Sequence, residues 1–211
     1  MKSVKAKDFF SGADREKIRE AVASAEAGTS GEIATMVVDH SDSYREAEVL
    51  GAVLVAGLVA LIVCVMIHHV TVWSYIPVVL LGFFPARYLL RSFPRLKIPF
   101  IGKRRLVHAV RDRAVRAFFE KGLYRTREES GVLIFISLLE RKVWILGDRG
   151  INTKIPPHDW HDLVQELSTG MREGRACGTL CAVIGRCGEK MAVHFPRKAD
   201  DVNELPDDVL T

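Results

Sequence analysis

Two long apolar segments between Val49 and Leu90 constrain this fold more than any other feature of the chain. The first, residues 49–67, contains no charged residue and no proline. At 1.5 Å per residue it would extend about 28 Å as a helix, close to the roughly 30 Å hydrocarbon core of a bilayer. The second, residues 70–90, contains two prolines, which membrane helices tolerate better than soluble helices. The sequence therefore predicts a transmembrane helical hairpin over residues 49–90.

The alternative is a hairpin buried inside a soluble protein. A chain of 211 residues has too little other protein to cover two such helices, which favours the membrane. Trp73 and Tyr75 lie near the start of the second segment, where aromatic side chains prefer the membrane interface. His68 and His69 mark the polar break. They could sense pH there, although a simple turn explains them equally well.

The flanks of the hairpin predict its orientation, because basic residues near membrane ends stay in the cytoplasm. The net charge is +4, and residues 1–10 lack the apolar region of a signal peptide. We therefore expect both termini in the cytoplasm and a basic interfacial linker over residues 91–102. The linker lacks the aromatic pattern of a nucleic-acid platform, so we expect lipid and not nucleic acid as its partner. Anionic lipid headgroups would contribute about 1 kcal/mol per basic side chain. The basic residues expected at the membrane surface are Arg87, Arg91, Arg95, Lys97, Lys103, Arg104 and Arg105.

Residues 1–48 and 103–196 read as one α/β domain split by the hairpin, followed by an acidic tail over residues 197–211. The tail could dock on the basic linker or on a partner, although a solvated tail is the default. Hydrophobic periodicity predicts a small central mixed sheet sandwiched by helices, its first two strands parallel and its third antiparallel. The expected helices cover residues 13–27, 103–123, 158–172 and 179–194, and the expected strands cover residues 31–39, 131–139 and 142–147.

Short motifs at the strand boundaries make the chain resemble the TPM domain family. The family is named for a thylakoid lumen protein, a photosystem II repair protein and a nematode receptor regulator. The matching stretches are TSGEI at 29–33, SGVLI at 130–134, RKVWI at 141–145, GDRGI at 147–151, Gly174 and HFP at 194–196. The resemblance extends from about Phe9 to Pro196.

The resemblance implies a compact α/β fold whose central sheet lies between helices. It leaves activity open, because plant members are described as acid phosphatases and metal binders while others are non-enzymatic assembly factors for membrane complexes. The inserted hairpin resembles a bacterial membrane-anchored subgroup, which implies the cell inner membrane.

One edge of the predicted sheet gathers polar side chains. If the first two strands are parallel and the third returns, the start of strands one and two and the end of strand three share that edge. The residues there are Ser30, Glu32, Glu129, Ser130, Asp148 and Arg149. Glu32 and Asp148 could bind Ca²⁺ or Mg²⁺ through oxygens, and Arg149 with both serines could bind a phosphate. The alternative is structural: Asp148 caps the turn at Gly150, and Glu32 with Arg149 forms an ion pair of little energetic value.

Other constellations are weaker. The segment HDWHD over residues 158–162 lacks the HExxH spacing of a zinc site and is typical of a solvated helix start. Cys177 could act as a nucleophile with His194, but three cysteines in one helix are more often small core residues. No phosphate-binding glycine loop and no GxSxG nucleophile elbow occurs.

Two hypotheses follow. The first is a membrane-anchored cytoplasmic module that binds, assembles or maintains membrane protein complexes. The second is a metal-assisted phosphomonoester hydrolase that uses Glu32 and Asp148. The absence of a sharp catalytic motif favours the first.

Overall fold

The computed structural model describes residues 5–68, 71–197 and 208–211. The chain divides into two compact units, one formed by Met1–Ser41 with Val107–Thr211 and the other by Asp42–Leu106. His69, predicted to lie in the polar break of the hairpin, is outside the described residues, and so is most of the acidic tail. The helices and strands are α1 (Ala6–Phe9), α2 (Gly12–Glu26), β1 (Glu32–Val38), α3 (Arg45–Met66), α4 (Val72–Ser92), η1 (Pro94–Phe100), α5 (Lys103–Glu120), β2 (Gly131–Ser137), β3 (Lys142–Gly147), α6 (Arg149–Lys154), η2 (Pro157–Trp160), α7 (His161–Arg172) and α8 (Ala176–His194).

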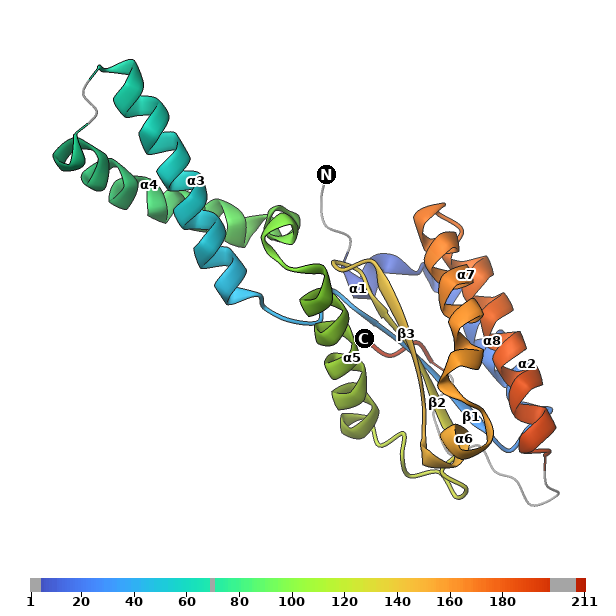
Figure 1. The fold of residues 1–211 in the computed structure, drawn as a ribbon. Helices are drawn as coiled ribbons and strands as arrows, with labels where there is room; N and C mark the ends of the chain where they lie inside the picture. Colours follow the sequence, from blue (N-terminus) through green and yellow to red (C-terminus); the bar gives the residue numbers. More distant parts are fainter. Residues whose placement is uncertain (1–4, 69–70, 198–207) are drawn as a thin grey trace. The chain divides into compact units, whose positions relative to one another are not determined.

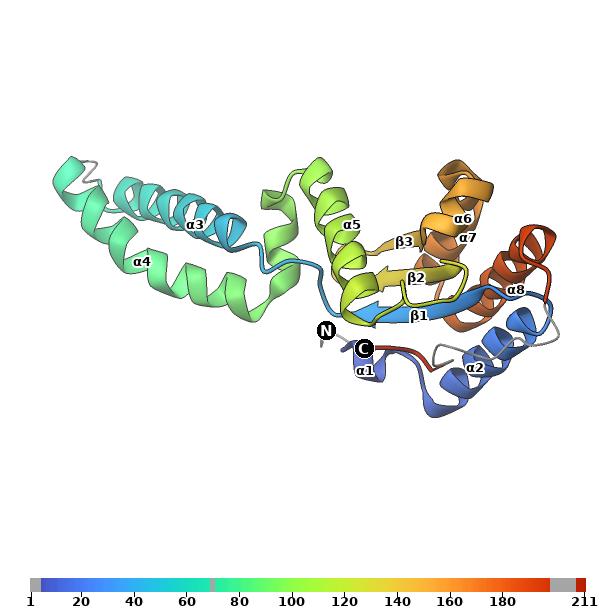
Figure 2. The ribbon, with the colours of Figure 1, turned by 90° about the horizontal axis from the view of Figure 1, so that it is seen from below.

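The first unit is built on a three-stranded mixed sheet in the order β1-β2-β3, as the sequence predicted. β1 and β2 are parallel, with Glu32 opposite Gly131, and β2 and β3 are antiparallel, with Val132 opposite Gly147. All seven residues of β2 are buried because helices cover both faces. Figures 1 and 2 show α5 on one face and α2, α7 and α8 on the other. The fold is therefore the expected α/β sandwich.

Alternating side chains divide the core between the two faces of the sheet. Ile33, Ile134 and Ile145 pack among α2, α7 and α8, whereas Leu133 and Phe135 pack against α5. The period of two in each strand explains this division, because successive side chains point to opposite faces.

The two short helices α1 and α6 were not predicted. Both have fewer than two turns, which is too little sequence for a hydrophobic period to emerge. The helix predicted over residues 158–172 divides into η2 and α7, since Trp160 ends a 3₁₀ turn before the α-helix begins. Gly122 and Gly174 follow α5 and α7 with positive φ angles of 71° and 76°, the conformation that glycine adopts most readily after a helix.

The outer edge of β1 is covered by groups from elsewhere in the chain. Glu26 Oε1 accepts the Ile33 N–H at 2.7 Å. The Leu210 N–H donates to the Thr35 carbonyl at 2.8 Å, and Leu210 O accepts the Val37 N–H at 2.9 Å. A short piece near residue 210 therefore extends the sheet beyond β1, although the tail was expected to be solvated.

The second unit is a hairpin of two long apolar helices, α3 and α4. Small side chains of α3 are fully or almost fully buried at every fourth position, namely Ala52, Ala56, Ala60 and Cys64. A Cβ atom added at Gly82 of α4 would meet Ala56 at 3.6 Å, so the backbones approach closely there. Helices in membranes pack through such small residues.

A buried ion cluster lies at the base of this hairpin. Glu48 of α3 is 6% exposed and accepts from Lys97 Nζ and Arg87 Nε, both at 3.2 Å. Lys97 of η1 is itself only 8% exposed and also donates to the Ser43 carbonyl at 3.3 Å. A buried charge requires such partners, so the cluster fixes η1 against α3.

Candidate functional site

The predicted polar edge exists, and the register of the sheet shows how its residues are ordered. Gly131 of β2 lies between Glu32 of β1, its direct partner, and Asp148, whose N–H donates to the Gly131 carbonyl at 2.8 Å. The Glu32 N–H donates to the Ser130 carbonyl at 3.2 Å. The start of two parallel strands and the end of the antiparallel strand therefore meet at one edge.

Asp148 is the N-cap of α6. Its Oδ1 accepts the Arg149 N–H at 2.7 Å, while its buried Oδ2 has no hydrogen-bond partner among the described residues. Burial raises the pKa of the Asp148 carboxyl above its ordinary value of 3.8, the Arg149 N–H opposes this rise, and the nearby charge of Glu129 adds to it. Asp148 therefore caps α6 at a position where burial and Glu129 disfavour its negative charge.

The loop before β2 closes tightly over α6. Glu129 has a φ angle of 52°, a left-handed conformation that is uncommon outside glycine, and its carbonyl accepts the Ile151 N–H at 3.3 Å. A Cβ atom at Gly150 would lie 2.3 Å from the Glu128 carbonyl. The absence of a side chain at Gly150 is thus what allows the loop to approach.

The two serines of this edge donate their hydroxyl protons within the protein. Ser130 Oγ donates to the Ser30 carbonyl at 3.1 Å, and Ser30 Oγ donates to the Pro196 carbonyl at 3.3 Å. Arg149 is exposed at the first position of α6. Of the three groups predicted to bind phosphate, Ser130 is buried, Ser30 is half-buried and Arg149 is exposed. The phosphate site remains a prediction.

The same edge offers few ligands for a cation. The described residues include no group of three or more His, Cys, Asp or Glu side chains that could hold one metal ion. Glu32 is buried, and a Cβ atom at Gly131, between Glu32 and Asp148, would lie 2.5 Å from the Leu123 carbonyl. Ca²⁺ prefers six to eight oxygen ligands, so two carboxylates make a sparse donor set. The cation site therefore rests on Glu32 and Asp148 alone and stays a prediction.

Asp148 nevertheless borders a surface pocket of about 440 Å³ beside α5. Phe118, Phe119 and Leu146 provide its apolar side, and Asn152 and Thr153 of α6 provide polar groups. The Asn152 amide donates to the Gly147 carbonyl at 2.6 Å. This pocket gives a small polar ligand a route to the Asp148 side of the sheet.

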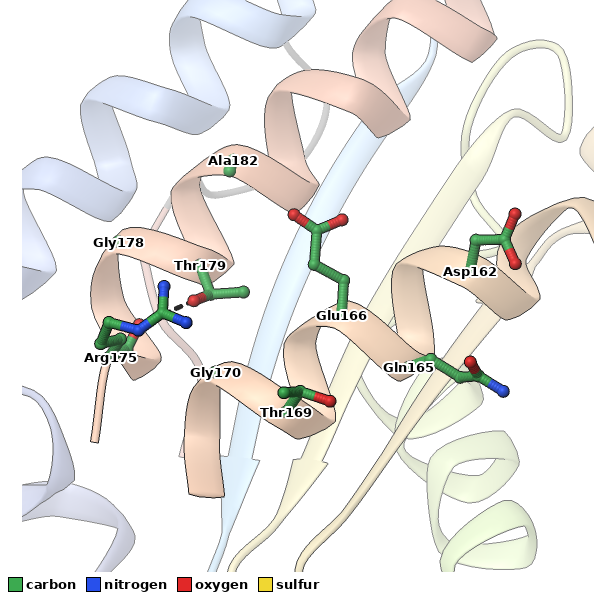
Figure 3. A pocket seen from close by; sticks show the side chains of 9 residues that line it. All are labelled: Asp162, Gln165, Glu166, Thr169, Gly170, Arg175, Gly178, Thr179 and Ala182. Carbon is green, nitrogen blue, oxygen red and sulfur yellow. Dashed lines mark hydrogen bonds between the residues drawn. The ribbon is translucent and has the colours of Figure 1, made fainter. Parts of the chain in front are cut away.

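A second pocket of about 530 Å³ lies between α7 and α8, where Figure 3 shows Glu166 on α7 and Arg175 at the start of α8. Glu166 forms an ion pair with Arg186, and Arg175 forms one with Glu173. Thr179 Oγ1 donates to the Arg175 carbonyl at 2.9 Å. Two of the charged residues that line this pocket, Glu166 and Arg175, are thus paired with residues outside its lining.

The histidine and cysteine constellations do not form a site among the described residues. His158 lies 3.2 Å from Asp159, while His161 Nε2 lies 2.8 Å from the Gln165 amide nitrogen. Burial raises the pKa of the Cys177 thiol to about 12, helped by its hydrogen bond with Asp14 and the neighbouring Cys181. A thiol with a raised pKa is a poor nucleophile at neutral pH, because the thiolate is the reactive form.

The basic residues predicted at the membrane surface divide into two groups. Arg91, Arg95, Lys103 and Arg104 are exposed, and Arg105 pairs with Glu46 at 3.0 Å and Asp42 at 3.4 Å while remaining exposed. Lys97 is buried with Glu48, as described above, and Arg87 is exposed but shares that carboxylate. Sequence reasoning did not anticipate the buried pair, because the acid and the base lie 49 residues apart.

Comparison with known proteins bears on the first unit. Residues 103–189 match the TPM domain, a range that begins with α5 and includes β2, β3, α7 and most of α8. Residues 103–189 therefore carry the TPM domain match. Helix α2 and strand β1 precede the matched range, yet β1 pairs with β2 along its whole length and therefore belongs to the same sheet.

A solved structure has the same fold. The BA42 protein from the psychrophilic bacterium Bizionia argentinensis, determined by NMR, aligns with a TM-score of 0.61 and 21% sequence identity. The alignment covers 98% of this chain and 97% of that one. No curated protein matches the chain.

Proposed function

We propose that this protein is a membrane-anchored binding module. The α3–α4 hairpin would hold the TPM domain at the cytoplasmic face of a bacterial inner membrane, where the domain binds another membrane protein and helps to assemble or maintain its complex. The observation that carries the proposal is the apolar outer surface of the hairpin.

On that surface the large apolar side chains are exposed, whereas a soluble protein buries such side chains in its core. Both helices are long and apolar enough to cross a membrane. Yet only 28% of the most apolar 18-residue stretch of α3 is buried, and only 6% of the corresponding stretch of α4. The helices bury small residues between them and expose large ones, including Leu58 at 60%, Leu81 at 76% and Phe84 at 70%. Water would penalise an exposed apolar surface of this extent, whereas lipid would not. The buried core helix of a soluble protein has the opposite distribution.

The orientation rests on charge. Exposed basic residues gather at the end of α4, in η1 and at the start of α5, namely Arg91, Arg95, Lys103, Arg104 and Arg105. The positive-inside tendency places them in the cytoplasm, where they can meet anionic headgroups. The turn near Thr71 would then face the opposite side.

A labelling experiment tests the anchor and its orientation together. The four native cysteines are replaced by serine, and single cysteines are introduced as Thr71→Cys and, for comparison, Glu189→Cys on α8. A membrane-impermeant maleimide added to intact spheroplasts should label only the first, and lysis should expose the second. Labelling only at position 189 would reverse the orientation, and release of the protein by alkaline carbonate would refute the anchor.

The binding role has its own test. Deletion of the protein should lower the amount of at least one assembled membrane complex on native gels, and the full chain should restore it. An unchanged set of complexes would remove the assembly role while leaving the anchor intact.

The Asp148 edge favours a second candidate, a metal-assisted phosphomonoester hydrolase. The supporting observations are the raised pKa of Asp148, its buried Oδ2 and the adjacent pocket. This candidate expects cation-dependent hydrolysis of a chromogenic phosphomonoester that Asp148→Ala abolishes. Activity that stays flat with Mg²⁺ and Ca²⁺ across the acid and neutral pH range would exclude it.

A further inference from the structure

The two edges of the central sheet differ. At β1, Glu26 and Leu210 satisfy outward-pointing backbone groups, as described above. At β3, the Asp148 N–H points inward to Gly131, so alternation along the antiparallel strand turns the amides of Val143 and Ile145 outward. The Gly147 carbonyl on this side accepts from Asn152, but Val143 and Ile145 have no outward partner in the part of the chain that the structure describes.

A pocket of about 500 Å³ lies along this edge, where Val143 and Ile145 are 5% and 8% exposed. It is lined by β3, by Val107 and Val110 of α5 on one face of the sheet, and by Val164 of α7 on the other. Figure 2 shows β3 as the outermost strand, with α5 and α7 on opposite faces. Since the lining joins both faces, the pocket must sit against the outer edge of β3.

The pocket has an apolar interior and a basic rim. Trp144 and Trp160 contribute aromatic surface, and Arg141, Lys142 and Arg172 contribute positive charge. Among its described lining residues none is acidic, although Asp159 stands next to His158 at the rim. Charge complementarity therefore favours a negatively charged occupant.

Trp160 supplies an independent sign that an acceptor is missing. Its side chain is 2% exposed, and its indole N–H finds no hydrogen-bond acceptor among the described residues. A buried polar group without a partner costs free energy, and native proteins rarely keep one without a reason. A carbonyl of an occupant would satisfy it.

We propose that the outer edge of β3 and its pocket bind an extended acidic segment of a partner protein by strand addition. The main chain of the segment would pair with Val143 and Ile145, its alternate apolar side chains would enter the pocket, and its acidic side chains would meet Arg141, Lys142 and Arg172. Exposed sheet edges recognise peptides in this way. The proposal rests on the proposed function, since it names the surface by which the membrane module would hold its client.

The test uses the full chain in lipid nanodiscs and a displayed library of random twelve-residue peptides, with the Arg141→Glu, Arg172→Glu double variant as counter-selection. The peptides enriched should alternate apolar and acidic residues and should lack proline at the positions that pair with β3. A synthetic peptide of the enriched sequence should bind by fluorescence anisotropy and shift the amide signals of Val143 and Ile145. The double variant should lose at least tenfold in affinity, and so should a peptide with proline at its centre.

Arg116→Glu on α5 is the matched control, because Arg116 is exposed and lies outside the pocket lining. The same loss of affinity in this variant would show that only net charge matters and would overturn the proposal. Failure to enrich any peptide over the counter-selecting variant, or enrichment of basic peptides, would overturn it too. Neither result would touch the anchor, which the labelling and carbonate experiments decide separately.

Discussion

At the scale of single residues, burial and charge at Asp148 oppose each other. The carboxylate caps α6 through Oδ1, which a neutral amide oxygen could do equally well. Its charge is disfavoured by burial and by Glu129. The sequence suggested the capping role correctly, but it could not reveal the raised pKa, because the loop that buries Asp148 is placed by tertiary packing.

The variant Asp148→Asn should therefore raise the melting temperature at pH 7. A raised pKa in the folded state means that the protonated form stabilises the fold at low pH, and that this contribution disappears as the pH rises through the raised value. The difference between variant and wild type should shrink as the pH falls towards 3.8. Thermal melts in detergent between pH 3 and 8 would measure it.

Asp112→Asn, at an exposed position of α5, is the control and should change the melting temperature little. A lower melting temperature for Asp148→Asn at pH 7 would contradict the prediction. It would mean that the charge meets a favourable partner such as a bound cation.

Cys177 should react slowly with alkylating reagents despite its partial exposure. A shift of its pKa from 9.0 to about 12 lowers the thiolate population at pH 8 by roughly a thousandfold. Site-resolved mass spectrometry after iodoacetamide treatment should show much slower alkylation at Cys177 in the folded protein than in urea. Rates within tenfold of each other would refute the raised pKa.

At the scale of elements, the strands and long helices were predicted well because their periods are strong. The seven-residue strands β1 and β2 are rich in β-branched residues, and α5 carries a regular apolar stripe. Two features of the elements escaped prediction. Leu210 joins β1 through backbone hydrogen bonds that leave no trace in side-chain pattern. The β3 pocket depends on the packing of α5, η2 and α7 around the strand.

The crossing of α7 and α8 yields a prediction of its own. A Cβ atom at Gly170 would lie 2.6 Å from Thr179 Cβ, whereas a Cβ atom at Gly185 of α8 would meet nothing within 4 Å. Gly170→Ala should therefore destabilise the fold by about 1–3 kcal/mol through overpacking. Gly185→Ala should stabilise it by about 0.5–1 kcal/mol, because alanine loses less conformational entropy in a helix.

Chemical denaturation of both variants, each compared with wild type, would decide the point. Equal effects of the two substitutions would show that α7 and α8 are farther apart than the structure places them.

At the scale of the whole molecule, the sequence predicted a domain split by a hairpin, and the chain leaves the first compact unit after Ser41 and returns to it at Val107. The first unit has its own hydrophobic core on both faces of the sheet. Replacement of residues 42–106 by a flexible Gly-Ser linker of about 15 residues should therefore give a water-soluble domain with native secondary structure. Circular dichroism and size-exclusion chromatography without detergent would test this expectation, and aggregation would contradict it.

The split arrangement also sets an order of events during synthesis. A hydrogen bond between the Ser41 N–H and Glu140 joins residues 99 apart, and the ribosome makes both long apolar helices, α3 and α4, between them. At roughly 5–20 residues per second, β1 waits several seconds for the strand that completes its ladder. Through that interval its apolar side chains have no sheet to enter, so β1 stays without its partner strand until β2 has been made.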